Sequence, residues 1–177
     1  MAAPERRDDG GTVLRRWTVE DAPAVAHALR DNLAYLSAWM PWAKPEIADE
    51  DFQRERMAAA ATRYSDDTAD WEFAICTATG ALVGACGILE RGGNPRVWYW
   101  VAREQAGNGH ATRAARMLTG IWQDCRAERR LEIWCDEANL ASVAIPARLG
   151  YRLDRVVEVE PETHTETGRM MVWVLDR

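Results

Sequence analysis

The chain has 177 residues, of which 47% are apolar and 28% are charged, and its net charge is −6. This length allows one domain with a full hydrophobic core and leaves little room for a second. The negative charge argues against a protein that mainly grips nucleic-acid phosphates, because that task needs a broad cationic surface. We expect residues 1–11 to be a flexible N-terminus and residues 12–177 to form a single domain.

The cysteines and the apolar runs bear on metal binding and location. Cys76, Cys86, Cys125 and Cys135 form no C-x-x-C pair and have no histidine pair beside them, so we expect neither a metal site nor a disulfide framework. The N-terminus lacks the apolar stretch of a signal peptide, and no run has the length of a membrane span. We therefore expect a cytoplasmic protein with no membrane partner.

The first third of the chain predicts one strand followed by helices. Thr12 to Trp17 has the β-branched start of a strand. Thr18 and Asp21, three residues apart, resemble a capping box that opens a helix. The expected helices cover residues 18–32, 33–40 and 49–65, and the second of them ends because Pro41 disfavours helix at the residue before it.

The middle of the chain predicts a hairpin and a further strand. Two β-rich runs, residues 71–77 and 82–90, are joined by the turn signal Ala78-Thr79-Gly80-Ala81. Gly84 and Gly87 indicate a bulge or a close approach of neighbouring backbone. Breaks are expected at residues 66–68 and 91–95, and a third strand at residues 97–101.

The last part of the chain alternates strands and helices. The predicted elements are a helix over residues 110–126, a strand over 131–135, a helix over 139–149 that Gly150 ends, and strands over 151–160 and 170–175. The first helix has an apolar face made of Ala114, Leu118, Ile121, Trp122 and Cys125. The expected fold is α/β (α+β), a three-layer domain with a mixed sheet of about seven strands and helices on both faces.

A glycine-bearing loop, Ala106-Gly107-Asn108-Gly109, stands between a strand and a helix. Backbone N–H groups at such a helix start point outward at the positive end of the helix dipole, which suits a phosphate. No lysine follows the glycines, so the loop is no Walker motif, and the dinucleotide pattern lacks its third glycine. From spacing alone, a tight turn before a helix explains the loop equally well.

The stretch Ala106-Gly-Asn-Gly-His-Ala-Thr-Arg-Ala114 resembles the acyl-CoA-binding loop of the GNAT acetyltransferases, R/Q-x-x-G-x-G/A, with Gly109, His110 and Ala111 at its last fixed places. A second GNAT signature is similar to Asn139-Leu-Ala-Ser142 and the turn after it, Arg148-Leu-Gly-Tyr151. The stretches Trp98-Tyr-Trp-Val101 and Leu36-Ser-Ala-Trp-Met-Pro-Trp42 are similar to the RimJ/RimL subgroup, which acetylates protein N-terminal amines.

The resemblance implies a sheet that splays at an acyl-CoA site and an enzyme that uses acetyl-CoA. It implies transfer of the acetyl group to a primary amine, above all a peptide N-terminus, by direct attack on a thioester whose carbonyl a backbone N–H polarises. No metal and no direct nucleic-acid partner are expected, and a homodimer is a further expectation. The implied acetyl-CoA contacts are Trp100, Val101, Ala106, Gly107, Asn108, Gly109, His110, Ala111, Thr112, Asn139 and Ser142.

The catalytic assignments also derive from the resemblance. Ser142 is the candidate acid for the leaving thiolate, although an ordinary polar residue in a first helical turn would look the same. RimJ/RimL-like proteins carry a glutamate where this chain has Arg96. The first candidate for the general base is therefore Glu160, and the next candidates are Glu162, Glu90 and Glu72. A solvated carboxylate is the competing interpretation of each. At Cys135, an acyl-cysteine competes with a small buried side chain.

Three tryptophans, Trp39, Trp42 and Trp98, are candidate acceptor contacts, with core packing as the alternative. If they line the acceptor groove, they could stack on a nucleobase-like substrate, which suggests detoxification of an amine such as an aminoacyl nucleotide. Pro146 should kink the last helix and leave the Ser142 carbonyl without its usual partner. Together with the missing glutamate, it suggests a third hypothesis, a catalytically silent acyl-CoA-binding module.

Overall fold

The computed structural model describes residues 3–63, 70–90, 93–126 and 130–175. The break expected at residues 66–68 lies outside this part of the chain, as do residues 91–92 of the expected turn. The strands are β1 (Arg6–Asp8), β2 (Thr12–Arg16), β3 (Trp71–Thr77), β4 (Leu82–Leu89), β5 (Arg96–Val101), β6 (Leu131–Asp136), β7 (Arg152–Glu158) and β8 (Arg169–Leu175). The α-helices are α1 (Ala22–Leu36), α2 (Glu50–Arg63), α3 (His110–Arg126) and α4 (Leu140–Arg148).

The strands form one sheet of eight in the order β1-β2-β3-β4-β5-β6-β8-β7. Only β5 and β6 are parallel among these neighbours. The expected seven strands are all present, and β1 is the additional one. It lies in the segment that we expect to be flexible, where Arg6–Asp8 pair with β2 and Ala3 is buried.

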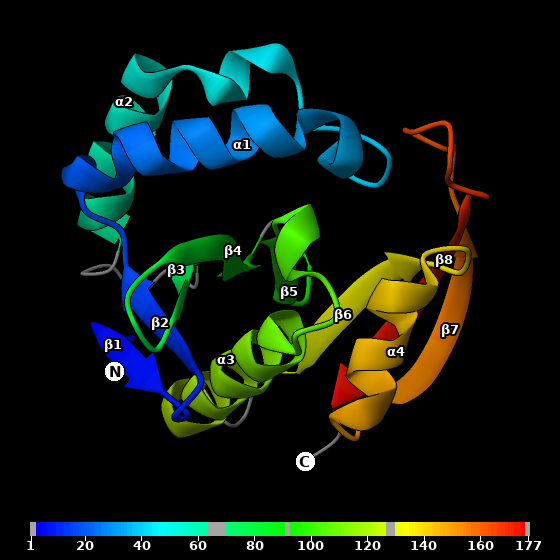
Figure 1. Cartoon of the computed structure of the whole chain (residues 1–177). Helices are drawn as coiled ribbons and strands as arrows, with labels where there is room; N and C mark the ends of the chain where they lie inside the picture. Colours follow the sequence, from blue (N-terminus) through cyan, green and yellow to red (C-terminus); the bar gives the residue numbers. More distant parts are fainter. Residues whose placement is uncertain (1–2, 64–69, 91–92, 127–129, 176–177) are drawn as a thin grey trace.

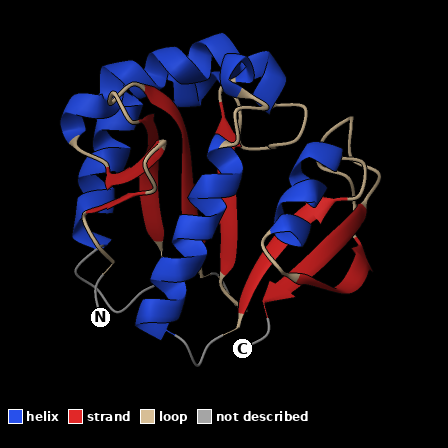
Figure 2. Cartoon of the chain, turned by 60° about the horizontal axis from the view of Figure 1, so that its bottom comes forward, coloured by secondary structure: helices blue, strands red, loops and turns tan. Residues whose placement is uncertain are grey.

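Helices cover both faces of the sheet, α1 and α2 on one side and α3 and α4 on the other (Figures 1 and 2). The α3 face packs as predicted, with Ala114, Leu118, Ile121 and Trp122 buried in one cluster. A second cluster joins α1 and α2 to the opposite face of the sheet. No helix in the described ranges is both long and apolar enough to cross a membrane.

The helix α1 runs without a break to Leu36, so the predicted end near Asn32 and the separate helix over 33–40 are wrong. The Thr18 amide donates to Asp21 Oδ2 at 3.0 Å, as the capping interpretation requires. The helix continues because Leu29 and Leu36 belong to one buried face and Asn32 itself is buried. Asn32 Nδ2 donates to the Ala28 carbonyl within the helix, while its Oδ1 accepts from the Arg103 amide, tying α1 to the chain after β5.

The two glycines of β4 mark close backbone approach, as predicted. A Cβ atom at Gly84 would lie 2.1 Å from the Trp100 carbonyl oxygen, and one at Gly87 would lie 2.1 Å from that of Trp71. Neither distance is compatible with a side chain. The register between β3 and β4 also shifts beside Gly84, which indicates a bulge.

The sheet splits between its two parallel strands. β5 and β6 pair only at Arg96 with Glu132 and at Val97 with Ile133, and then diverge. In Figure 2 the strands β6, β7 and β8 and the helix α4 stand apart from the rest of the sheet as a separate wing. The rest of β5 therefore has an edge that β6 does not cover, and this edge faces the opening in which the site is built.

Candidate functional site

Two adjoining pockets occupy the opening between β5 and β6, with volumes of about 120 and 190 Å³. Both are lined by Trp39, Met40, Tyr99, Asn139 and Ser142. The smaller pocket extends along the end of β5 toward α3, and the larger one extends toward β6. We name them after the roles that the sequence resemblance implies: the smaller one is the thioester pocket and the larger one is the reaction pocket.

The loop before α3 has the conformation that an anion site needs. Gly107 and Gly109 have φ angles of +83° and +81°, which residues other than glycine rarely adopt. The Arg113 amide donates to the Gly109 carbonyl at 3.0 Å, so helical bonding has begun by residue 113. The amides of the first turn, His110 to Thr112, have no acceptor of their own within a helix, and they face outward at its positive end.

His110 and Arg113 hold this loop in place. His110 is buried, and its Nδ1 lies 2.8 Å from Thr12 Oγ1 on β2. Burial, followed by the charge of Arg113, lowers the pKa of His110 below its usual value, which favours the neutral ring. Arg113 lies beside the loop, 3.4 Å from the Asn108 carbonyl, and it pairs with Asp9 at 3.7 Å. We infer that His110 anchors the loop to β2 and that Arg113 offsets the negative charge of Asp9 beside it.

Five of the predicted acetyl-CoA residues line the thioester pocket. Val101 and Ala111 line the thioester pocket together with Asn139 and Ser142, so β5, α3 and α4 meet there. Asn139 is the N-cap of α4, and its Oδ1 accepts from the Ser142 amide at 3.2 Å. Trp100 also borders this pocket, although it is only 5% exposed and packs mainly against α1 on the other face of the sheet.

Tyr99 is a central side chain that the sequence analysis missed. It lines both pockets, and its hydroxyl lies 3.1 Å from Ser142 Oγ. The hydroxyl also donates to the Ser142 carbonyl at 3.4 Å. That carbonyl is available because Pro146 has no N–H to offer it. The predicted helix defect therefore exists and orients a tyrosine. The alternation of β5, which places Tyr99 on the same face as Val97 and Val101, was the available signal.

Burial keeps the two acidic groups beside Ser142 protonated. It raises the pKa of the Tyr99 hydroxyl far above its ordinary value. Burial likewise raises the pKa of the Cys135 thiol to about 11. Cys135 is 5% exposed and borders the reaction pocket. A thiol that stays protonated at pH 7 is a poor nucleophile, which favours the structural interpretation of Cys135 over an acyl-enzyme.

The carboxylates near the reaction pocket differ from those expected. Glu160 is exposed and does not belong to the lining of either pocket in the opening. Glu166, six residues further on, does line the reaction pocket, and its Oε2 accepts from the amides of Glu162 and Thr163 at 2.7 and 3.1 Å. The sequence could not separate these glutamates, because only the fold of the loop between β7 and β8 decides which one faces inward.

Two further carboxylates serve the framework. Asp136 also borders the reaction pocket, but it accepts from the amides of Ala138, Thr167 and Gly168 and so fixes the same loop. Glu72 lies on β3 and pairs with Arg56 of α2, on the face of the sheet that α1 and α2 cover.

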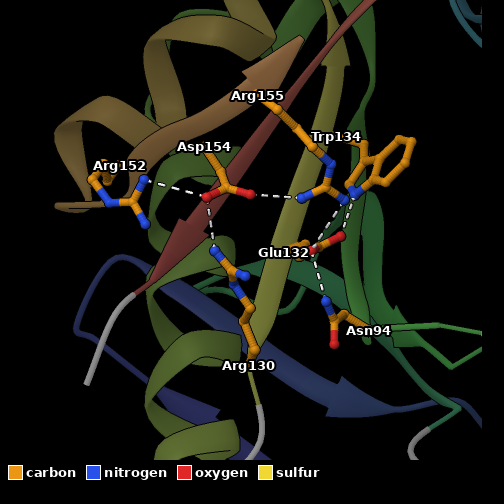
Figure 3. Close-up of polar contacts among 7 residues, drawn as sticks. All are labelled: Asn94, Arg130, Glu132, Trp134, Arg152, Asp154 and Arg155. Carbon is orange, nitrogen blue, oxygen red and sulfur yellow. Dashed lines mark hydrogen bonds and ion pairs between the residues drawn. The ribbon is translucent and has the colours of Figure 1, made fainter. Parts of the chain in front are cut away.

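Arg96, which replaces the expected glutamate, belongs to a structural cluster beside the opening. Its guanidinium carbon lies 3.5 Å from the centre of the Trp134 ring. The Trp134 N–H donates to Glu132 at 2.6 Å, and Asn94 donates to the same carboxylate at 2.8 Å (Figure 3). Asn94 precedes β5 and Glu132 lies on β6, so this bond joins the two strands at their paired end.

On the β7 side of this cluster, Asp154 joins three arginines, Arg130, Arg152 and Arg155 (Figure 3). Arg155 also lies 3.6 Å from Glu132. These contacts tie β7 to β6 and so hold the wing together.

The three predicted acceptor tryptophans all border the opening. Trp39 lines both pockets, while Trp42 and Trp98 line the reaction pocket and a third pocket behind β5. Within the described ranges, no group of three or more histidine, cysteine, aspartate or glutamate side chains could hold a metal ion.

The comparisons with known proteins agree on one fold. The model of the acetyltransferase (GNAT) domain family matches residues 12–152, which contain the loop, α3, Asn139 and Ser142. A search of curated protein sequences finds no significant match. The family match covers most of the chain and includes both stretches on which the site is built.

Solved structures repeat the whole architecture. RimL, a ribosomal L7/L12 α-N-protein acetyltransferase in complex with coenzyme A, superposes with a TM-score of 0.83 at 15% identity, over 99% of this chain and 97% of that one. A ribosomal-protein-S5-alanine acetyltransferase from Vibrio fischeri gives 0.84 at 15% identity, over 96% and 95%. The microcin C7 self-immunity acetyltransferase MccE, in complex with acetyl-CoA and AMP, gives 0.80 at 15% identity, over 94% and 93%. At such identities these likenesses establish the fold.

Proposed function

The chain belongs to the GNAT acetyltransferase family, and from this we propose that it transfers the acetyl group of acetyl-CoA to a primary amine by direct attack. One observation carries the proposal. The opening between β5 and β6 brings the mouth of α3, the free edge of β5 and the Tyr99–Ser142 pair into one continuous path. We infer a phosphate site at one end of this path and a proton donor at the other.

The residues present fit acetyl-CoA. The amides of His110 to Thr112 and the glycine loop would hold the diphosphate, with Arg113 beside them. Val101 and Ala111 border the space that suits the pantetheine arm. Acetyl-CoA supplies the reactive thioester, and a free backbone N–H on the β5 edge would polarise its carbonyl.

Tyr99 is the acid we propose for the leaving thiolate. A phenol is intrinsically a far stronger acid than a serine hydroxyl, and this order holds when the two groups are buried side by side, so proton transfer from Tyr99 is easier than from Ser142. The raised pKa of Tyr99 ensures that the proton is in place at neutral pH. Ser142, the candidate from sequence, then orients Tyr99 through the 3.1 Å contact. Glu166 is the candidate base, directly or through water, in place of Glu160.

The acceptor has two candidate classes. The N-terminal amine of a peptide or protein is the first, in keeping with the acceptor named for RimL. A small amine attached to a planar ring is the second, and the aromatic lining of the acceptor side favours it. Both classes present an α-amino group to the same reaction pocket.

The experiment that tests the proposal combines calorimetry and turnover. We expect acetyl-CoA to bind the purified protein, and free CoA thiol to appear when a peptide with a free N-terminus is added but not when that N-terminus is already acetylated. Binding without turnover on any amine would support the catalytically silent module. Absence of acetyl-CoA binding would remove the proposal altogether.

A further inference from the structure

A third pocket, of about 310 Å³, lies between the sheet and the α1–α2 pair, and the transfer step makes no use of it. Its walls include four aromatic side chains, Trp42, Phe52, Trp98 and Trp100. We call it the aromatic pocket. It is the largest of the three pockets around β5, and its volume is at the lower end of the range typical of ligand sites.

The aromatic pocket opens beside the reaction pocket. Trp42 and Trp98 line both of them, and the reaction pocket also contains Ser142 and Cys135. An acceptor that places its amine beside Ser142 therefore has the aromatic pocket next to it for the rest of its structure. Because one ligand can reach both spaces, we treat the aromatic pocket as part of acceptor recognition.

The aromatic walls are arranged to receive a flat group. Trp98 lies against β4 only because residue 87 is glycine, since a Cβ atom there would be 2.8 Å from the ring atoms Cε2 and Cζ2. Trp42 and Phe52 are 43% and 45% exposed, although large aromatic side chains usually bury most of their surface. A planar ligand between these rings would cover them and gain stacking contacts.

One wall of the pocket carries charges of both signs. Arg56 on α2 pairs with Glu72 on β3, and Glu72 is only 9% exposed. Gln53 accepts from Arg56 Nε at 2.9 Å and donates to the Ile47 carbonyl at 2.6 Å, so the guanidinium is held in one orientation. The wall therefore offers N–H donors next to carboxylate acceptors, which match a ring with both kinds of group on one edge.

We propose that the aromatic pocket binds a planar heteroaromatic ring of the amine acceptor, with its polar edge toward Arg56 and Glu72. This inference rests on the proposed function and specifies its substrate class. A phenylalanine side chain of a peptide would use the aromatic walls but form no hydrogen bond with the charged wall. A nucleobase joined to an amino acid would use both and place its α-amine in the reaction pocket.

A matched set of acceptors tests the proposal. Alanyl sulfamoyl adenosine, Ala-Trp amide and Ala-Leu amide share one alanine α-amine and differ only in the group joined to the alanine carbonyl. We expect kcat/KM, measured by release of CoA thiol, to fall in that order. The nucleoside should exceed the leucine peptide by at least about 5-fold, the lower bound of what stacking of one base contributes.

Variants locate the effect in the pocket. Phe52→Ala and Trp42→Ala should lower kcat/KM for the two ring-bearing acceptors more than for Ala-Leu amide, and Glu72→Gln should act mainly on the nucleoside. Leu153→Ala is the matched control, because Leu153 is 38% exposed on β7 and borders none of the three pockets. An unchanged dissociation constant for acetyl-CoA confirms that each variant is folded.

The outcomes separate this inference from the function on which it rests. Equal rates for all three acceptors, unaffected by Phe52→Ala, would overturn the inference and leave acetyl transfer intact. A preference for Ala-Trp amide over the nucleoside would also overturn it, in favour of a peptide acceptor. If no amine is acetylated, the proposed function fails, and calorimetry of adenosine with wild type and Phe52→Ala still decides whether the pocket takes the ring.

Discussion

The two sides of the opening are built by different means. On the donor side, the binding groups that we propose belong to the backbone, in the glycine loop with its positive φ angles at Gly107 and Gly109, the first turn of α3 and the free edge of β5. On the acceptor side, side chains form the surface, above all Trp42, Phe52 and the Arg56–Glu72 pair. A surface of backbone groups tolerates many sequences, while a surface of side chains changes with each substitution. Binding of acetyl-CoA should therefore tolerate many substitutions, whereas the choice of acceptor should depend on the side chains of this chain.

The largest effect is expected where the two sides meet, at Tyr99. Tyr99→Phe should lower kcat about 100-fold, the low end of the range for a lost general acid, without weakening acetyl-CoA binding. Ser142→Ala should lower kcat less, because it removes an orienting contact and leaves the donor. Steady-state kinetics with calorimetry check both variants. If Ser142→Ala lowers kcat more than Tyr99→Phe does, Ser142 is the acid.

A substitution at a single glycine tests whether the loop backbone binds acetyl-CoA. Gly109→Ala places a Cβ at a φ of +81°, which costs about 1–2 kcal/mol and should weaken acetyl-CoA binding about 5- to 30-fold. The control is Gly120→Ala within α3, where the nearest non-local atom lies 4.0 Å away and alanine is the better helix former. If the two variants bind acetyl-CoA equally well, the backbone of the loop is not the binding surface.

Two glutamates of one loop test which carboxylate acts on the acceptor amine. Glu166→Gln should lower kcat/KM for the amine about 10-fold or more at pH 7 if its carboxylate takes the proton, whereas Glu160→Gln should change it little. The loss should shrink at higher pH, because more of the amine is then already deprotonated. A pH profile of both variants measures this. Equal effects would assign the role to water or to neither residue.

The smallest effect is expected at Cys135, which touches the reaction pocket but takes no part in transfer. Cys135→Ala should retain kcat, and no acetyl-cysteine should be detected by mass spectrometry. Since the folded thiol has a pKa of about 11, its alkylation rate should keep rising above pH 9. The stability that this group contributes is present below pH 9 and is lost toward pH 11, because the unfolded thiol ionises first. Denaturant titrations at about pH 8 and about pH 10 of wild type and Cys135→Ala check the sign.

Local chemistry in the sequence determined much of this protein. The strand periodicity, the glycine loop and the N-cap Asn139 each act within a few residues, so seven strands, the start of α3 and the start of α4 could all be predicted. The Pro146 defect could also be foreseen, since the missing N–H is a property of one residue. The strand β1 and the unbroken α1 were missed because tertiary packing of Ala3 and Leu36 decides them.

Only the tertiary structure decided which side chains share the opening. Tyr99 on β5 meets Ser142 on α4 in the opening where β5 and β6 diverge, beyond their two paired positions and the Asn94–Glu132 bond. Glu166 rather than Glu160 faces the pocket because Asp136 fixes the loop that carries both. Phe52 and Arg56 on α2, Glu72 on β3 and Trp98 on β5 line one pocket from three elements. Contacts between residues far apart in the chain leave no local signature, and the acceptor side consists of such contacts.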